Sequence, residues 1–431
     1  MFTPRSISRR EWLTLSAAGV GVASLSGWFA PLAARASDQS AQGRKHKSCI
    51  LLWMDGGPSH VETFDPKPDA GDAVMAGIGA IQTSVPGILI GDKFPNLAGL
   101  MEHGVLLRGM STDEADHTRA RQYMHTGYKP GVGGISYPGL GSIVSAELGN
   151  PDSPLPNFVV TGSALNKYEY LADPGFRGPN HQGLALYDAS QGLTNLSPAV
   201  GAAEFTSRVG ILDELEKGFL KTHQTVAAES RHSSLARALR LIRSGKGNVF
   251  DITGESAQTR ANYGESAFGD GCLLARRLVE AEVPFVEVYL ASWDTHEKNV
   301  HDDSRKLMTQ VDRGMSALIQ DLQSRGLLDS TLIIWMGEFG RSPQASPRGG
   351  RDHYARAWST ALFGGGIKGS QVIGKTDARG AAVIDRPISA VDFMATICTI
   401  LDIKLDKEIV TPNGRPIRTI DKGERIITEI I

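Results

Sequence analysis

Short, continuous apolar runs are the feature that most constrains the fold of this chain. The first run, Cys49 to Met54, ends at Asp55-Gly56-Gly57. A run of this length that ends at turn residues is typical of a β-strand buried on both faces of a sheet. The same pattern recurs at residues 104–110, 157–161, 284–290 and 331–336. These runs predict the strands of one central sheet.

Helical patterns lie between these runs, clearest at residues 270–281 and 304–325, where apolar residues recur every three or four positions. The alternation predicts an α/β fold with a mostly parallel central sheet and helices on both faces. Residues 152–262 are poorer in strands and richer in Gly, Ser and Asn, with one expected helix near 207–220. We interpret this stretch as an insertion that covers the sheet edge, and a substrate lid is one form it could take.

Composition excludes several classes of protein. The 431 residues include 45 Lys and Arg against 47 Asp and Glu, 41% hydrophobic residues and 49 glycines, which rules out disorder, collagen and coiled coil for the whole chain. The formal net charge of -2 provides no basic field, so nucleic acid is not an expected partner. Cys49, Cys272 and Cys398 show no CxxC spacing, so neither a disulfide framework nor a zinc ribbon is predicted.

The first 36 residues combine Ser8-Arg9-Arg10-Glu11-Trp12-Leu13 with a weakly apolar stretch and an Ala34-Arg35-Ala36 ending. This pattern predicts a twin-arginine signal peptide, cleaved after Ala36, and hence export by the twin-arginine machinery to the periplasm or the exterior. The alternative is an uncleaved membrane anchor, although Gly and Ser dilute the stretch. Residues 37–47 form an expected flexible lead-in, and 48–431 a single domain without stable membrane insertion.

Acids and histidines follow the ends of several predicted strands. They are Asp55, Asp294 with His296, Glu338, and His353 in the later loop of residues 349–354. Ligands bind beyond the carboxyl ends of parallel strands, and carboxylate and imidazole groups suit zinc, manganese or iron. The sequence therefore predicts a site for one or two divalent metal ions at this edge. Taken singly, each residue has an alternative role in capping a helix or fixing a loop.

The segment from Asp116 to Pro130 follows the strand that ends near Met110. A helix that opens at His117 or Thr118 would direct free backbone N–H groups and its positive dipole end at a bound anion. Arg121 would add a charged fork one turn later. The alternative is a surface helix with ordinary charges.

In their order along the chain, these segments resemble the alkaline phosphatase and sulfatase superfamily. Residues 117–130 are similar to the sulfatase signature Cys/Ser-x-Pro-Ser-Arg followed by Thr-Gly-Arg/Lys-x-Pro, and the resemblance places the nucleophile position on His117 and the signature Arg on Arg121. Residues 391–401 are similar to a helix near the end of sulfatases, without its Pro. The resemblance implies an alkaline phosphatase-like three-layer sandwich.

More closely, the chain resembles the exported bacterial proteins of the "domain of unknown function 1501" family, over nearly the whole mature chain. The residues that carry this resemblance are Trp53 to His60 with Thr63 to Pro68, Trp293 to His296, Gly337 to Arg341, and Asp352-His353, together with the twin-arginine leader. That family has no settled activity, so the resemblance implies the fold and leaves the function open.

Carried over residue by residue, the superfamily resemblance implies one metal position at Asp294, His296 and His353 and a second at Asp55 and Glu338. This chain departs from the pattern in three places: Lys298 stands where a His is usual, Phe339 follows Glu338, and His117 replaces the Ser, Thr or modified Cys. Histidine can attack phosphorus or ligate metal, but it cannot become formylglycine. Thr118 is an alternative nucleophile.

The leading hypothesis is an exported metal-dependent hydrolase of phosphate esters, or less favoured sulfate esters, in small molecules or polysaccharides. Zinc is the first choice of metal, with manganese, calcium or iron as alternatives. Arg121 would stabilise negative charge, and His60 would donate a proton. The rival hypothesis is a noncatalytic binding or scaffold protein of the cell envelope. An oxidoreductase has little support, because Gly364-Gly365-Gly366 is not a dinucleotide-binding motif.

Overall fold

One eight-stranded sheet forms the centre of the protein, whose computed structural model describes residues 47–162, 172–297 and 300–431. The strand order is β12-β4-β11-β8-β1-β7-β5-β6, and the neighbouring pairs are parallel except for the two that β11 makes. The predicted α/β class with a mostly parallel sheet is therefore confirmed. The strands are β1 (Ser48–Met54), β4 (Gly104–Met110), β5 (Phe158–Gly162), β6 (Leu184–Leu186), β7 (Phe285–Leu290), β8 (Thr331–Met336), β11 (Trp358–Gly364) and β12 (Gln371–Ile373).

The five predicted apolar runs correspond to β1, β4, β5, β7 and β8. All residues of β1 are buried, because the strand has a neighbour on each side and apolar layers above and below. Strand β11 was not predicted from the sequence, and it pairs antiparallel with both β4 and β8. Its run contains the buried polar residues Ser359 and Thr360, which interrupt the apolar pattern used to recognise the other strands.

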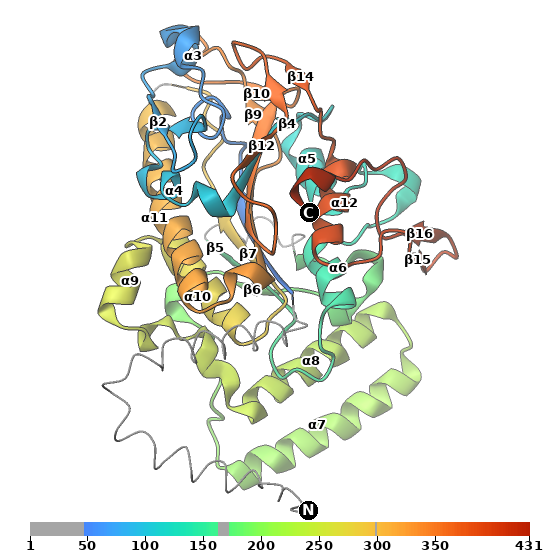
Figure 1. Ribbon diagram of the computed structural model, residues 1–431. Helices are drawn as coiled ribbons and strands as arrows, with labels where there is room; N and C mark the ends of the chain where they lie inside the picture. Colours follow the sequence, from blue (N-terminus) through green and yellow to red (C-terminus); the bar gives the residue numbers. More distant parts are fainter. Residues whose placement is uncertain (1–46, 163–171, 298–299) are drawn as a thin grey trace, which may run out of the picture. The chain divides into compact units, whose positions relative to one another are not determined.

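Helices cover both faces of the sheet (Figure 1). On one face α10 and α11 pack against residues such as Ile50 and Val286, and on the other α6 and α12 pack against Leu51 and Phe285. The predicted helices at 270–281, 304–325 and 207–220 correspond to α10, α11 and α7. The helices are α3 (Asp72–Met75), α4 (Pro95–Ala98), α5 (His117–Thr126), α6 (Leu140–Glu147), α7 (Ala202–Thr222), α8 (Val226–Ser244), α9 (Ala257–Tyr263), α10 (Ala267–Glu280), α11 (Val300–Ser324) and α12 (Ala390–Ile400).

Four two-stranded antiparallel pairs supplement the sheet. Of these, the pair β9 and β10 bears on function, because it carries Arg341 and His353. The pairs are β2 (Ala80–Gln82) with β3 (Leu89–Gly91), β9 (Gly340–Arg341) with β10 (His353–Tyr354), β13 (Lys375–Thr376) with β14 (Val383–Asp385), and β15 (Glu408–Val410) with β16 (Pro416–Arg418).

Only part of residues 152–262, the stretch predicted as an insertion, lies outside the central sheet. Its strands β5 and β6 pair with each other, and β5 also pairs with β7, so this part belongs to the central sheet. The segment that resembles an insertion is the hairpin of α7 and α8. The pattern of apolar residues did not distinguish it from β5 and β6, which precede it. Of the side chains of α7, Val209 and Glu216 are buried, whereas Ile211 and Leu215 are exposed.

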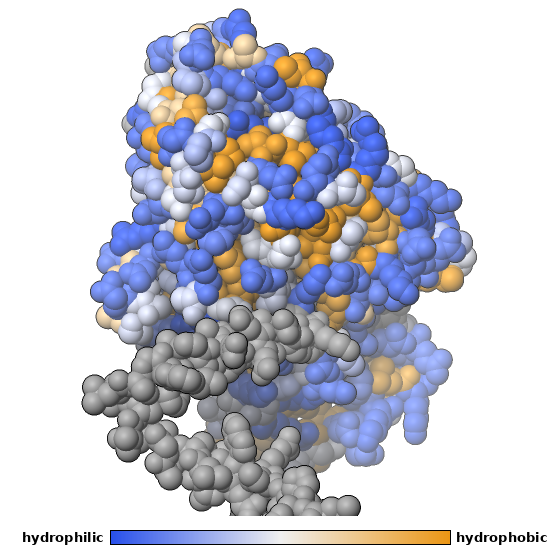
Figure 2. All heavy atoms as spheres, in the orientation of Figure 1, coloured by the Kyte–Doolittle hydropathy of each residue, from blue (hydrophilic) through white to orange (hydrophobic). Residues whose placement is uncertain are grey.

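Figure 2 shows a surface on which hydrophilic and apolar residues are interspersed, with mostly hydrophilic residues over the α7–α8 hairpin. Among the described residues, no helix is both long enough and apolar enough to span a membrane. The predicted signal peptide (1–36), the lead-in up to residue 46 and Lys298 lie outside the described residues.

Candidate metal centre

The loops that follow β1, β7 and β8 meet at one edge of the sheet, because these three strands are adjacent and parallel. Asp55 follows β1, Asp294 follows the end of β7, and Glu338 follows β8. Helix α5 reaches the same edge after β4. Linked contacts at this edge connect all the residues predicted from sequence as metal ligands, together with two further predicted residues: Asp55, Asp294, His296, Glu338 and His353, with His117 and Arg121.

Two glycines allow the loops to approach one another closely. Gly56 has φ +110°, and a Cβ atom there would lie 2.3 Å from the backbone nitrogen of Asp294. At Gly350, a Cβ atom would lie 2.1 Å from the backbone carbonyl carbon of His296. Any side chain at either position would push Asp294 or His296 away, so the backbone contact depends on glycine.

Helix α5 begins at His117, one of the two starts predicted from sequence. The Asp116 side chain caps it by accepting a hydrogen bond from the Arg119 backbone N–H at 3.1 Å. The helix ends at Gly127, whose φ of +72° is left-handed. The Asp116 carboxylate places negative charge at the helix start, which opposes the predicted use of this terminus as an anion cradle.

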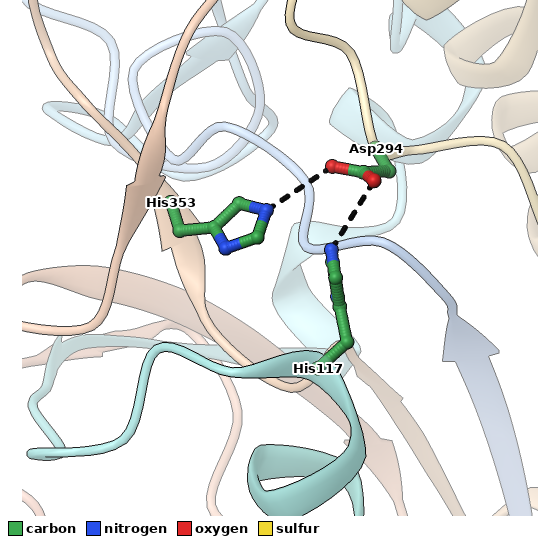
Figure 3. A group of neighbouring side chains, drawn as sticks. All are labelled: His117, Asp294 and His353. Carbon is green, nitrogen blue, oxygen red and sulfur yellow. Dashed lines mark hydrogen bonds and ion pairs between the residues drawn. The ribbon is translucent and has the colours of Figure 1, made fainter.

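Four side chains at the rim of the edge form what we call the rim cluster: His117, Asp294, His296 and His353. Asp294 Oδ1 lies 2.9 Å from His296 Nε2 and 3.3 Å from His353 Nε2, and the two Nε2 atoms are 3.0 Å apart. Asp294 Oδ2 lies 3.3 Å from His117 Nε2. Figure 3 shows the His117 and His353 rings pointing at the Asp294 carboxylate from α5 and β10.

The other ring nitrogen of each histidine faces an oxygen. His117 Nδ1 lies 2.6 Å from Glu338 Oε1, His353 Nδ1 lies 2.8 Å from the carbonyl oxygen of Ala115, and His296 Nδ1 lies 3.4 Å from Asp352 Oδ1. An Nδ1–H that donates to oxygen leaves a lone pair on Nε2. All three lone pairs then point at Asp294, which is itself an acceptor.

Positive charge next to Asp294 therefore stabilises the rim cluster, and Arg341 and a protonated His117 can both supply it. Burial opposes a charged imidazole at His117, but Asp294 and Glu338 outweigh it and raise the pKa of His117 to about 9. Burial likewise opposes ionisation of Asp294, but His117, His353 and Arg341 hold the pKa of Asp294 well below its usual range. His117 Nε2 is buried and has no hydrogen-bond partner among the described residues.

The donors fit a divalent transition-metal ion. One ligand atom from each of His117, Asp294 and His353 lies within 4.8 Å of the others. Ligands of a tetrahedral ion lie about 3.3 Å apart, and His117 Nε2 and His353 Nε2 each lie 3.3 Å from an Asp294 oxygen, Oδ2 and Oδ1 respectively. Histidines whose second nitrogen is held by an oxygen are typical of metal ligands. Calcium fits this set poorly, because it prefers oxygen ligands alone.

Beneath the rim cluster lie three ion pairs that we call the buried pairs: Asp55–Arg121, Glu62–Arg351 and Glu287–His125. Arg121 binds both oxygens of Asp55, with Nη2 to Oδ2 at 2.9 Å, and its Nε lies 3.8 Å from Glu338 Oε1. Glu338 is fully buried and also accepts the Gly56 N–H at 3.0 Å. The guanidinium of Arg121 thus lies between the two acids predicted to hold a second metal, which disfavours a second ion there.

Arg341 is a member of the site that the sequence analysis did not assign. It is 1% exposed, contacts Asp294 through Nη2, and donates from Nη1 to His296 Nε2 at 3.2 Å. Nε donates to the Gly57 carbonyl at 3.0 Å. Burial lowers the pKa of Arg341, and Asp294 opposes that shift. Arg341 could have been assigned to the site from the sequence, because it lies three residues after Glu338 in the loop that follows β8.

Two predicted catalytic residues have contacts elsewhere. His60 is buried, and its Nε2 lies 2.8 Å from the carbonyl oxygen of Gly380, in the turn between β13 and β14. Burial lowers the pKa of His60 to about 4, so the ring is neutral near pH 7 and carries no proton of suitable acidity to donate. Thr118 is exposed at the second position of α5.

Solved structures similar to this chain include a sulfatase from Pseudoalteromonas sp., at 16% identity and a TM-score of 0.40, covering 85% of this chain and 69% of that one. A lipoteichoic acid synthase from Listeria monocytogenes matches at 11% identity and a TM-score of 0.39, covering 83% and 72%. A protein in the alkaline phosphatase superfamily from Vibrio parahaemolyticus matches at 11% identity and a TM-score of 0.39, covering 83% and 67%.

A comparison with curated protein sequences found no match. A family described as "Protein of unknown function (DUF1501)" matches residues 46–431, which include every residue of the rim cluster and the buried pairs. This match confirms the family resemblance inferred from the motifs around Asp55, Asp294 and Glu338. The chain belongs to the DUF1501 family.

Proposed function

We propose that this protein is a metal-dependent hydrolase that binds one divalent transition-metal ion at the rim cluster. The observation that carries the proposal is the orientation of three histidines whose Nδ1 atoms face oxygens and whose Nε2 atoms all face Asp294. Asp294, His353 and His117 would hold the ion, and His296, which accepts from Arg341, borders it. When bound, such an ion polarises an ester oxygen and lowers the pKa of water.

The charges of the site favour an anionic substrate. With His117 neutral, as a metal-bound imidazole is, the three carboxylates Asp55, Asp294 and Glu338 and the two guanidiniums of Arg121 and Arg341 give a net charge of -1. A divalent cation would change this to +1. A phosphate ester fits that charge. Sulfate esters are less favoured, because the position that resembles the sulfatase nucleophile holds His117.

His117 fits a ligand role better than a nucleophilic one. Its Nδ1 is engaged by Glu338 at 2.6 Å, and its Nε2 is buried beside Asp294 Oδ2. A nucleophile needs a lone pair open to the substrate, which neither nitrogen offers in this arrangement. Water is accordingly the proposed attacking group, with Arg341 holding Asp294 in place.

Metal analysis and hydrolysis assays test the proposal. The purified protein should hold about one equivalent of zinc, manganese or iron, and the loaded protein should hydrolyse p-nitrophenyl phosphate or bis(p-nitrophenyl) phosphate faster than p-nitrophenyl sulfate. His353→Gln should lose both properties. His181→Gln, the same change at a histidine that contacts Ser145, should lose neither. Metal binding without hydrolysis would favour the noncatalytic binding protein, and failure to bind metal would overturn the proposal.

We also propose that the protein acts outside the cytoplasmic membrane on small-molecule or polysaccharide esters. The support is the Ser8-Arg9-Arg10 motif and the Ala34-Arg35-Ala36 cleavage pattern. Replacing Arg9 and Arg10 together with Lys should retain the protein in the cytoplasm, and sequencing of the exported protein should begin at Ser37. Export of the double variant would contradict this proposal.

A further inference from the structure

Helix α5 meets the sheet through three charged side chains on one face. His117, Arg121 and His125 are spaced four residues apart and therefore share a side of the helix. Their carboxylate partners come from three neighbouring strands: Glu338 follows β8, Asp55 follows β1, and Glu287 lies within β7. The helix thus crosses three adjacent strands and makes one charge pair at each.

The third pair lies deepest and has no role in the proposed chemistry. Glu287 is 1% exposed, and its Oε1 lies 3.1 Å from His125 Nε2. His125 Nδ1 lies 2.8 Å from the carbonyl oxygen of Arg121. Both ring nitrogens face oxygens, so the imidazole donates at each side and carries a positive charge. A carboxylate placed in the middle of a core strand is costly to bury, and a partner of opposite charge offsets that cost.

The pair is coupled to the site above it. The ring of Trp53 lies 4.1 Å from the His125 ring, measured between centroids, and Trp53 Nε1 donates to Asp55 Oδ1 at 3.3 Å. Asp55 in turn binds Arg121, whose carbonyl oxygen accepts from His125. His125, held by Glu287, therefore contacts the backbone of Arg121 directly and its side chain through Trp53 and Asp55.

Apolar packing leaves one side of α5 open. A cavity of about 350 Å³ flanks the helix, and Arg121, Gln122, His125 and Thr126 line it. Tyr123 and Met124 pack into the apolar cluster on another side of the helix. Apolar contacts on the cavity side therefore do not hold the helix, which leaves the charge pairs to fix its rotation there together with the packing of Tyr123 and Met124.

We propose that Glu287 and His125 are positioning residues, which fix the rotation of α5 so that Arg121 reaches Asp55 and His117 reaches Asp294. The effect on zinc affinity rests on the proposed function. The effect on the contact between Arg121 and Asp55 does not. A purely structural pair would stabilise the fold and leave the rim cluster unchanged.

The test replaces the pair by apolar residues of similar volume, Glu287→Met with His125→Phe. Apolar replacement of a buried ion pair often leaves stability unchanged or raises it. We expect the double variant to fold with a melting temperature close to that of the wild type, but to bind zinc about 10- to 100-fold more weakly, as when a residue behind a ligand is lost. Unchanged zinc affinity would overturn the proposal.

A metal-independent comparison separates this proposal from the previous one. Crystal structures of the metal-free wild type and double variant should show Arg121 in contact with Asp55 only in the wild type. Retention of that contact in the variant would overturn the positioning role even if the wild type binds no metal. If the double variant does not fold, Glu287→Gln keeps the side-chain shape and gives the same comparison. Glu255→Gln, which breaks a pair with Arg276 on the opposite face of the sheet, should leave zinc affinity unchanged.

Discussion

The rim cluster and the buried pairs draw on the same residue types at the same edge of the sheet, yet they differ in how their charges are matched. Each acid among the buried pairs faces a cation within hydrogen-bonding distance, as Glu62 faces Arg351 at 2.5 Å. In the rim cluster, three imidazole lone pairs converge on one carboxylate. The buried pairs match one acid with one base, whereas in the rim cluster the histidines share a carboxylate that also binds Arg341.

Exposure follows the same division. The Asp294 side chain is 46% exposed, whereas the Asp55 side chain is 6% exposed and that of Glu62 is 3% exposed. A group that exchanges a ligand needs access to solvent, and a group that holds loops together needs to exclude it. The rim cluster is therefore open to solvent, as the proposed metal site requires, whereas the buried pairs are closed to it.

The largest effect is expected from breaking a buried pair. Asp55→Asn should lower the free energy of unfolding by about 3–5 kcal/mol, because it removes the carboxylate that binds the buried Arg121 guanidinium at two nitrogens and leaves only the longer 3.8 Å contact with Glu338. Urea denaturation of the metal-free protein measures this. The matched change Asp294→Asn should cost less than Asp55→Asn does, because Asp294 is 46% exposed and solvent screens its pair with the buried Arg341. Equal losses would break the distinction between the two groups.

The next largest effect is a loss of folding stability at acidic pH, caused by the buried His60. The pKa of His60 in the folded protein is about 4, because burial lowers it from the ordinary histidine value of 6.5. As pH falls, the unfolded chain therefore takes up the proton first. The stability is fully present above pH 6.5 and is lost progressively down to about pH 4, by about 3 kcal/mol in total.

Urea denaturation at pH 7 and at pH 4.5 measures this loss, and His60→Gln should reduce it. His223→Gln, the same change at an exposed histidine after α7, should not alter it. A wild-type protein whose loss of stability on acidification is the same as that of His60→Gln would contradict the prediction.

Most of the sheet could be predicted from the sequence, because parallel strands buried on both faces read as short apolar runs. The run that became β1 is wholly buried, and the same holds for β7 and β8. Strand β11 escaped recognition since Ser359 and Thr360 interrupt its pattern. Both hydroxyl oxygens are buried and have no hydrogen-bond partner among the described residues, a placement that the sequence pattern does not predict.

The site could be predicted only in part. Asp55, Asp294 and Glu338 were predicted from their residue types and their positions after strands, because the ends of strands can be recognised in the sequence. The pairing of acids with bases could not be predicted, because it depends on the directions of the side chains. Arg121 therefore took a predicted anion-binding role, whereas in the structure it pairs with Asp55. The burial of Arg341 could not be predicted from the surrounding sequence.

A direct test of the rim cluster is removal of its central carboxylate. Asp294→Asn should weaken zinc binding by at least about 100-fold, or about 2.7 kcal/mol, since every imidazole of the cluster faces this residue. Competition with a chromophoric chelator measures the dissociation constant. Asp55→Asn should change zinc affinity less than Asp294→Asn does. The reverse order would place the metal at Asp55 and Glu338, and would make the buried pairs part of the binding site.

The smallest effect is expected at Asp352, the outermost carboxylate of the site. Its side chain is 78% exposed and lies 3.4 Å from His296 Nδ1, a separation too long for a strong hydrogen bond. Asp352→Asn should therefore weaken zinc binding less than about threefold and change stability by less than about 0.5 kcal/mol. It is the same chemical change as Asp294→Asn, two contacts further from the centre. A loss as large as that of Asp294→Asn would mean that His296 is a ligand whose orientation depends on Asp352, and the rim cluster would then hold its ion through His296 rather than His117.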